Sequence, residues 1–269
     1  ATGNGVAVQP DGKIVVVGSG ADPGNGRDFA VARLDADGLL DTSFDGDGRV
    51  TTAIGAGDDR ACAVAIQADG KIVAAGYTQT ATDKDFAVAR YNPDGSLDTS
   101  FSLDGKATAS IGDDVGNAVV LLANGRIIVA GYSVINSIVN ITMARFGPDG
   151  TAELTAIIDV GQGGAMGKAA ALQPDGKVFI AGFTFGGAGG DFAGVTVDAD
   201  GTLERILTTS IGPGSDRANA VVIQSDGKIV VAGSSFNGFS QDVALVRYDL
   251  DGSLDTSFSG DGMVTTAVA

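Results

Sequence analysis

Residues 60–76, which read RACAVAIQADGKIVAAG, decide the fold of this chain. In this stretch the dipeptide Asp69-Gly70 joins two short runs rich in Val, Ile and Ala. Asp-Gly is favoured in tight hairpin turns, because the central residues of such turns need positive φ angles. The two runs are also short for helices and have strand-like composition. The stretch therefore predicts a β-hairpin.

The same turn and strand recur along the whole chain. The turns step by 58, 55, 51 and 51 residues, and their first residues are Asp11, Asp69, Asn124, Asp175 and Asp226. A second Asp-Gly follows each turn and steps by 57, 55, 51 and 51 residues; its aspartates are Asp37, Asp94, Asp149, Asp200 and Asp251. Two markers with one period indicate that a whole supersecondary unit is repeated five times.

One repeat predicts four strands. In the second copy the expected strands are residues 61–68, 71–78, 85–91 and 105–111, with Gly/Asp-rich turns between them and no helical period. Four-stranded units of this size are typical of β-propeller blades, whereas an open β-solenoid would use shorter coils. We therefore predict an all-β, five-bladed β-propeller with four antiparallel strands per blade. As one domain, 1–269, it would have blades at 1–57, 58–112, 113–163, 164–214 and 215–269.

The composition excludes several classes of function. There are 17 basic and 33 acidic residues, a net charge of −16, which argues against nucleic-acid binding. No apolar run approaches the ~18 residues that a membrane-spanning helix needs, so no membrane insertion is expected. Cys62 is the single cysteine, and the chain has no histidine. A disulfide framework, a Ser-His-Asp triad and histidine metal ligands are therefore excluded.

Two stretches resemble the bacterial delta-60 repeat. They are residues 60–76 and 85–101, the latter reading DFAVARYNPDGSLDTSF, and the resemblance extends over essentially the whole chain. It implies a propeller-like fold, tandem repeats in secreted or cell-surface bacterial proteins, and no established activity. Copies three and four depart from the pattern, because they lack the Leu-Asp-Thr-Ser-Phe segment found at 40–44, 97–101 and 254–258. Copy four also has Thr196 where the other copies have arginine.

A ring of polar residues is the first candidate site. Near the start of the expected innermost strands, aligned copies carry Asn4, Cys62, Asn117, Lys168 and Asn219. Arg60 and Arg217 precede two of these positions. Such groups around a propeller axis could bind a small polar or anionic ligand, or they could only cap and hydrate the channel mouth. Lys168 stands out because it replaces an amide in the copy without the neighbouring acid.

Acidic residues supply the catalytic alternative. Asp59, Asp114 and Asp216 lie just before the ring positions and could serve a carboxylate-based glycoside hydrolase or lyase. This alternative rests on analogy with other propellers, since one fold hosts many functions. Lys168, with Cys62 nearby, is a further candidate as a Schiff-base amine.

Calcium is the cofactor that the acidic turns suggest. Three carboxylates fall within seven residues in copies one and five; they are Asp35, Asp37 and Asp41, and Asp249, Asp251 and Asp255. Asp/Gly loops can supply the six to eight oxygens that Ca²⁺ needs. Alternatively, Asp-Gly is what a hairpin requires, and Asp41, Asp98 and Asp255 could cap the serines two residues later in Asx-type turns.

The remaining recurrent residues are assigned to structure. Four copies carry an arginine at the end of the third strand; these are Arg33, Arg90, Arg145 and Arg247. Because an active site in an array usually occurs once, these arginines and the lysines after the hairpin turns (Lys13, Lys71, Lys177 and Lys228) are expected to brace the blades. Aromatic residues follow the second strands, where they could stack on sugars but are expected to pack at blade edges; they are Tyr77, Tyr132, Phe183, Phe185, Phe236 and Phe239.

These observations favour a non-catalytic module that binds a ligand or serves as a scaffold or adhesion domain in a secreted or surface bacterial protein. The expected partners are a small polar or anionic ligand, a glycan or a protein. Nucleic acid is not among them.

Overall fold

A computed structural model describes residues 1–22, 26–161, 163–186 and 189–267, and over these residues the chain forms twenty strands and no helix. The first two groups of four strands are β1 (Thr2–Val8), β2 (Ile14–Asp22), β3 (Gly26–Leu34), β4 (Arg49–Thr52), β5 (Asp59–Ile66), β6 (Ile72–Gln79), β7 (Lys84–Tyr91) and β8 (Lys106–Ala109). The third group is β9 (Asp113–Leu121), β10 (Ile127–Ile135), β11 (Ile138–Phe146) and β12 (Ala152–Ile158). The last two groups are β13 (Ala165–Leu172), β14 (Val178–Thr184), β15 (Phe192–Val197), β16 (Leu203–Thr209), β17 (Asp216–Ile223), β18 (Ile229–Phe236), β19 (Gln241–Tyr248) and β20 (Met263–Thr266).

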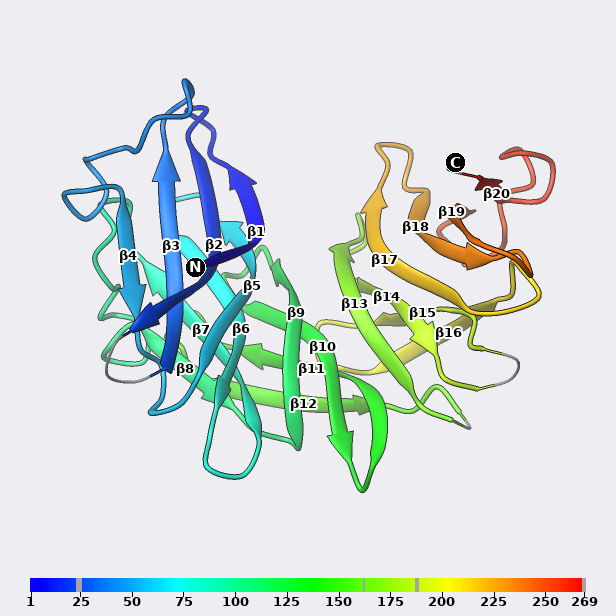
Figure 1. The fold of residues 1–269 in the computed structure, drawn as a ribbon, viewed down its shortest axis with the longest axis horizontal. Coiled ribbons are helices and arrows are strands. Elements are labelled where there is room, and N and C mark those ends of the chain that lie inside the picture. The colour runs from blue at the N-terminus through cyan, green and yellow to red at the C-terminus, as the bar shows by residue number, and fades with distance from the viewer. Residues whose placement is uncertain (23–25, 162, 187–188, 268–269) are drawn as a thin grey trace. The chain divides into compact units, whose positions relative to one another are not determined.

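The strands form five four-stranded sheets, here called blades 1 to 5 in chain order (Figure 1). In each blade the neighbouring strands are consecutive in the sequence, and the strand pairings described for blades 1, 2, 4 and 5 are antiparallel. The predicted all-β propeller fold is therefore confirmed. Each blade also lies within one of the five ranges expected from the repeat.

By its internal contacts the chain divides into two compact units, which we describe separately. Unit 1 comprises residues 1–129 and 143–155, and unit 2 comprises residues 130–142 and 156–269. In the described part of the chain, no helix is long and apolar enough to cross a bilayer.

The hydrophobic core lies between consecutive blades. In unit 1, Phe29 and Phe44 of blade 1 pack in one buried cluster with Ile72 and Tyr91 of blade 2. In unit 2, Phe179 of blade 4 belongs to a similar cluster with residues of blade 5. Within each unit, a blade thus buries apolar side chains against its neighbour, as repeats that cannot bury their hydrophobic face alone do.

A β-bulge interrupts the first strand of four blades. The register shifts between Gly3 and Gly5, and the equivalent shifts skip Cys62, Lys168 and Asn219. The second strand carries a glycine opposite each bulge; the glycines are Gly18, Gly76, Gly182 and Gly233. A Cβ atom at any of them would overlap a carbonyl oxygen of the first strand. The bulge therefore requires a residue without a side chain on its partner strand.

An ion-paired brace closes the outer part of every blade. In blade 2, Asp98 Oδ2 accepts hydrogen bonds from Arg90 Nε at 2.7 Å and lies 2.9 Å from Lys71 Nζ. Blades 1 and 5 repeat this arrangement with Asp41 and Asp255. The predicted structural role of the arginines and lysines is therefore consistent with the contacts that they make.

The brace is also present in the two blades that depart from the repeat pattern. The Leu-Asp-Thr-Ser-Phe segment is confined to three blades, but the ion pair that it supports is not. Blade 3 uses Glu153, which pairs with Arg126 at 2.6 Å and Arg145 at 3.0 Å, and blade 4 uses Glu204, which pairs with Lys177 at 2.6 Å. Both glutamates lie eight residues after the third-strand position of the arginine, as the aspartates do. They are the only glutamates in the chain.

Candidate functional site

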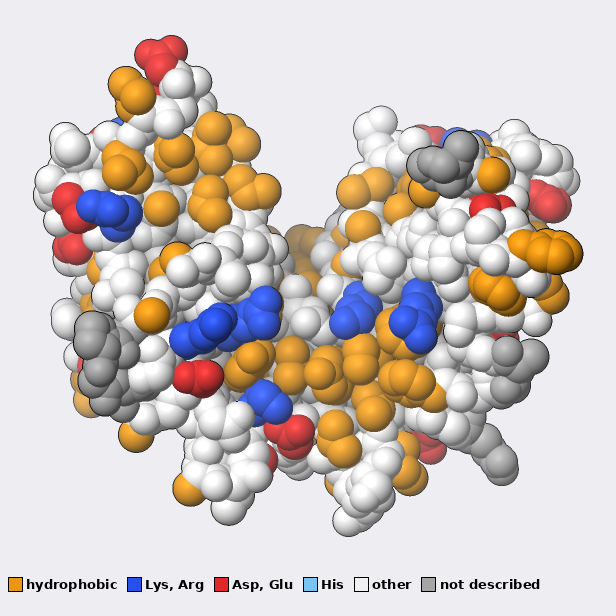
Figure 2. Space-filling view, in the orientation of Figure 1, with side chains coloured by type: hydrophobic (Ala, Val, Ile, Leu, Met, Phe, Trp, Pro, Cys, Tyr) orange, Lys and Arg blue, Asp and Glu red, His pale blue; other side chains and the backbone are white. Residues whose placement is uncertain are grey.

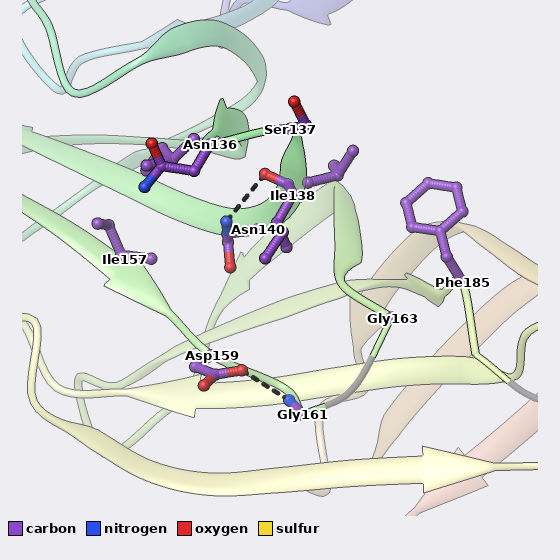
Figure 3. Close-up of a pocket in the computed structure, with 11 residues that line it drawn as sticks. Asn136, Ser137, Ile138, Asn140, Ile157, Asp159, Gly161, Gly163 and Phe185 are labelled. Atoms are coloured by element: carbon purple, nitrogen blue, oxygen red, sulfur yellow. Dashed lines mark hydrogen bonds between the residues drawn. The ribbon is translucent and has the colours of Figure 1, made fainter.

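A cleft of about 650 Å³ in unit 2 is the candidate site (Figure 3). Ligand-binding cavities are typically of this size, with apolar walls and a few polar groups. The wall comes from the β10–β11 hairpin, the end of β12, the connection from β12 to β13 and the segment after β14.

The hairpin that forms one wall turns within two residues. Asn136 and Ser137 have φ angles of 51° and 66°, as a tight hairpin turn requires. Because the turn is so short, it brings Ile138 to the cleft while the side chain stays 53% exposed. Ile157 of β12 is 50% exposed and contributes a second apolar surface.

Hydrogen-bonding groups face the same space. Asn140 Nδ2 donates to the carbonyl oxygen of Ile138 at 3.1 Å, and Figure 3 shows the amide oxygen pointing into the cleft. Asp159 accepts a hydrogen bond from the Gly161 N–H at 2.8 Å, which fixes its carboxylate at the cleft edge. The Asn140 amide oxygen and the Asp159 carboxylate are therefore acceptors, suited to a ligand that donates hydrogen bonds, and the amide of Asn136 and the hydroxyl of Ser137 also line the cleft.

An aromatic side chain stands opposite the hairpin. Phe185 is 44% exposed and lies across the cleft from Asn140 and Asp159 (Figure 3). Its ring packs edge-on against the buried ring of Phe183, with centroids 5.3 Å apart, and the guanidinium of Arg217 lies 5.3 Å from the Phe183 centroid. This stacking holds the Phe185 ring in place before any ligand arrives.

The sequence predicted little of this cleft. Of its residues, only Phe185 was a candidate, and blade-edge packing was its expected role. The other aromatics after second strands do not line the cleft; Phe239, for example, is 96% exposed at the tip of the following blade's hairpin. The available signal is irregularity, because copy three has Asn140 where the four other copies have aspartate. Copy three is also followed by the Gly-rich segment 161–167.

In unit 1, two of the predicted ring residues come together. Asn4 Oδ1 accepts a hydrogen bond from an Arg60 terminal nitrogen at 2.9 Å, and Asn4 Nδ2 donates to the Ala61 carbonyl at 2.8 Å. Cys62 is half-buried in the bulge of β5, where its thiol donates a long hydrogen bond to the Arg60 carbonyl at 3.9 Å, and Asn117 is half-buried in β9. The Asn4–Arg60 pair thus links the first strands of blades 1 and 2.

In unit 2, Lys168 and Asn219 are the bulge residues of β13 and β17. Asn219 Nδ2 donates to the Arg217 carbonyl at 3.4 Å, whereas Arg217 itself is exposed and stacked on Phe183. The ring as a whole stays a prediction.

The carboxylates proposed as catalytic alternatives are fully buried. Asp59 accepts from the Ile54 N–H at 2.6 Å and Asp216 from the Ile211 N–H at 2.7 Å. Asp114 makes the same bond to the Ile111 N–H at 2.9 Å. Each aspartate thereby holds the loop that enters its blade, and their catalytic role stays a prediction.

The proposed calcium ligands are held by other groups. Asp41 and Asp255 belong to the braces. Asp249 pairs with Lys228 at 2.6 Å. Asp35 and Asp251 accept hydrogen bonds from backbone N–H groups in their own turns. Asp37, in the turn of copy one, is exposed. No group of three Asp, Glu or Cys side chains that could hold a metal ion occurs among the described residues. Figure 2 accordingly shows acidic side chains scattered in ones and twos over the face in view. Calcium binding stays a prediction that calorimetric titration can test.

The capping alternative explains two of these carboxylates, Asp41 and Asp255, and also Asp98 of blade 2. Ser43 and Ser257 donate hydrogen bonds that hold the pKa of Asp41 and Asp255 well below the ordinary value of 3.8, with Lys13 and Lys228 acting in the same direction. At Asp98, burial would raise the pKa, but hydrogen bonds from Ser100 and Lys71 outweigh it and hold the pKa below the same value.

Acid is therefore expected to unfold the chain through these braces. A carboxylate whose pKa is lowered on folding adds stability that is complete above its unfolded pKa and is lost as the pH falls through the folded value. We expect the free energy of unfolding, measured in urea, to fall steadily from about pH 5 downward. Asp98→Asn should lower stability at pH 7 and flatten this slope. The exposed Asp47→Asn should do neither, and equal slopes for the wild type and Asp98→Asn would contradict the assignment.

Comparisons with known proteins agree with the fold. A family model for a domain of unknown function (DUF5122) beta-propeller matches residues 9–44, 67–101, 122–155 and 224–258, together just over half of the chain. No curated protein matches the sequence.

Two solved structures share the architecture. A protein of unknown function from Bacteroides caccae has a TM-score of 0.58 at 12% identity, over 98% of this chain and 86% of that one. A polysaccharide lyase of family PL25, an ulvan lyase, has a TM-score of 0.57 at 11% identity, over 97% of this chain and 68% of the lyase. At such low identity the likeness concerns the fold alone.

Proposed function

The chain belongs to the DUF5122 beta-propeller family, and we propose that it is a binding module that holds a ligand in the cleft of unit 2, rather than an enzyme. The observation that carries this proposal is the half-exposed Phe185 facing the acceptor groups of Asn140 and Asp159 across a cavity of about 650 Å³. The delta-60 resemblance supports placing the module in a secreted or cell-surface bacterial protein.

The lining favours a neutral saccharide as the ligand. A sugar ring offers an apolar face, which can stack on Phe185, and hydroxyl groups that donate to carboxylate and amide oxygens. An anionic ligand is disfavoured here, because the Asp159 carboxylate lies at the cleft edge and the chain has a net charge of −16.

The proposal is tested by calorimetric titration of neutral mono- and oligosaccharides into the wild type and Phe185→Ala. We expect the substitution to weaken binding at least about tenfold, as for an aromatic residue central to an interface. Phe239→Ala is the matched control, since that ring is exposed and far along the chain from the cleft, and it should bind like the wild type. If no neutral saccharide binds, or if both variants bind equally well, the cleft is not the site.

A further inference from the structure

We propose that Lys168 and Arg217 form a site for one oxyanion, such as a sulfate, phosphate or carboxylate group, separate from the cleft. The inference starts from the equivalent place in unit 1. There the bulge residue Asn4 supplies the acceptor for Arg60, which lies in the first strand of the next blade. An arginine at this position is thus satisfied by the amide oxygen of the preceding blade.

Blades 4 and 5 have the equivalent pair of positions, but the amide oxygen that accepts from the arginine is missing. Strand β13 lies against β17, as β1 lies against β5. Lys168 occupies the bulge of β13, as Asn4 does in β1, and Arg217 precedes the bulge of β17 by two residues, as Arg60 does in β5. The oxygen that would accept from the arginine is therefore replaced by a second cation.

Neither charge is neutralised by the protein. Within the described part of the chain, Lys168 makes no ion pair or hydrogen bond. Three residues before Lys168, blade 4 has Ala165, whereas blades 2, 3 and 5 have a buried aspartate at this position. The nearest aspartate in sequence to Arg217 is Asp216, but it is fully buried and accepts N–H groups from Ile211 and Gly212. Two cations thus occupy neighbouring strand positions in a protein that has a net charge of −16.

The geometry suits an oxyanion. The Phe183 ring holds the guanidinium of Arg217 in one place, at 5.3 Å from the ring centroid, so that its N–H groups are oriented in advance. A planar guanidinium can donate two parallel hydrogen bonds to an oxyanion, and a lysine ammonium adds a charge-assisted third. The anion would replace the missing amide oxygen and remove the repulsion between the two cations.

The test exchanges the residue types at the two equivalent bulge positions, 4 and 168. Sodium sulfate, sodium phosphate and sodium acetate are titrated calorimetrically at constant ionic strength into the wild type, Lys168→Asn and Asn4→Lys. We expect one site in the wild type, and the order of the three affinities identifies the preferred oxyanion. Lys168→Asn restores the amide found in blade 1, and it should weaken binding at least about tenfold, the loss expected for one charge-assisted hydrogen bond. Asn4→Lys should create a second site beside Arg60.

Lys106→Asn is the control for the loss of one positive charge as such, because Lys106 is paired with Asp104 rather than placed beside Arg217. This variant should bind like the wild type. In chloride buffer Lys168→Asn should keep or raise the melting temperature, because it removes the repulsion and offers Arg217 an acceptor. Absence of binding in the wild type, equal loss in Lys106→Asn, or a single site in Asn4→Lys would each overturn the proposal.

Discussion

Replacing Gly76 by alanine is expected to destabilise the chain by at least about 3 kcal/mol, measured by urea unfolding. Gly76 lies opposite the bulge of β5, and an added Cβ would overlap the carbonyl oxygen of Arg60. Backbone cannot move aside as a flexible side chain can, so the two strands must separate or the bulge must be lost. Either change also shifts Arg60 from its bond to Asn4.

Gly20→Ala is the control for this prediction. Gly20 also lies in a second strand, but its added Cβ would meet only the Thr51 and Ala30 side chains, at 3.3 and 3.5 Å. We expect a change within about 1 kcal/mol. Similar losses for the two variants would show that glycine is needed for strand flexibility rather than for the bulge.

The second large effect is expected at Arg90, whose replacement by alanine should lower the free energy of unfolding by about 3–5 kcal/mol. The side chain is 5% exposed and donates to Asp98, to Ser100 and to the Pro148 carbonyl of the next blade, while its guanidinium lies 4.5 Å from the Phe101 ring centroid. Its loss leaves a buried carboxylate with Lys71 as its remaining basic partner and removes a link between blades 2 and 3.

Arg49→Ala provides the comparison. Arg49 pairs with Asp47 at 3.1 Å, but both side chains are more than half exposed, and such surface pairs contribute about 0–1 kcal/mol. A loss at Arg90 no larger than the loss at Arg49 would contradict the brace.

The fold was predictable because its signals are local. The Asp-Gly turns specify hairpins, and their period specifies five equal units, so residues such as Asp69 and Gly70 locate every sheet without knowledge of packing. The serine-capped aspartates were likewise accessible, because Asp98 and Ser100 are two residues apart.

The functional features depended on contacts that a single strand does not reveal. Each bulge depends on the close approach of two strands, as where Gly76 faces the Arg60 carbonyl, and the sequence of one strand does not show this approach. The role of Glu153 could not be predicted, because this glutamate lies in a fourth strand, whereas the equivalent aspartates lie in the longer connection that precedes the fourth strand. The cleft was missed because its walls come from two irregular loops, around Asn136 and Phe185, that no repeat pattern aligns.

The two glutamates of the brace have a consequence for how such chains can change length. Blades 1, 2 and 5 reach the carboxylate position through the connections 35–48, 92–105 and 249–262, whereas blades 3 and 4 have only 147–151 and 198–202 and continue directly into the fourth strand. In the shorter blades the carboxylate sits on or beside that strand, and one extra methylene group lets it reach the same basic partner. A deletion in one repeat can therefore be compensated by a single Asp-to-Glu replacement. Repeats of unequal length can thus coexist in one chain, which leaves the connections free to diverge.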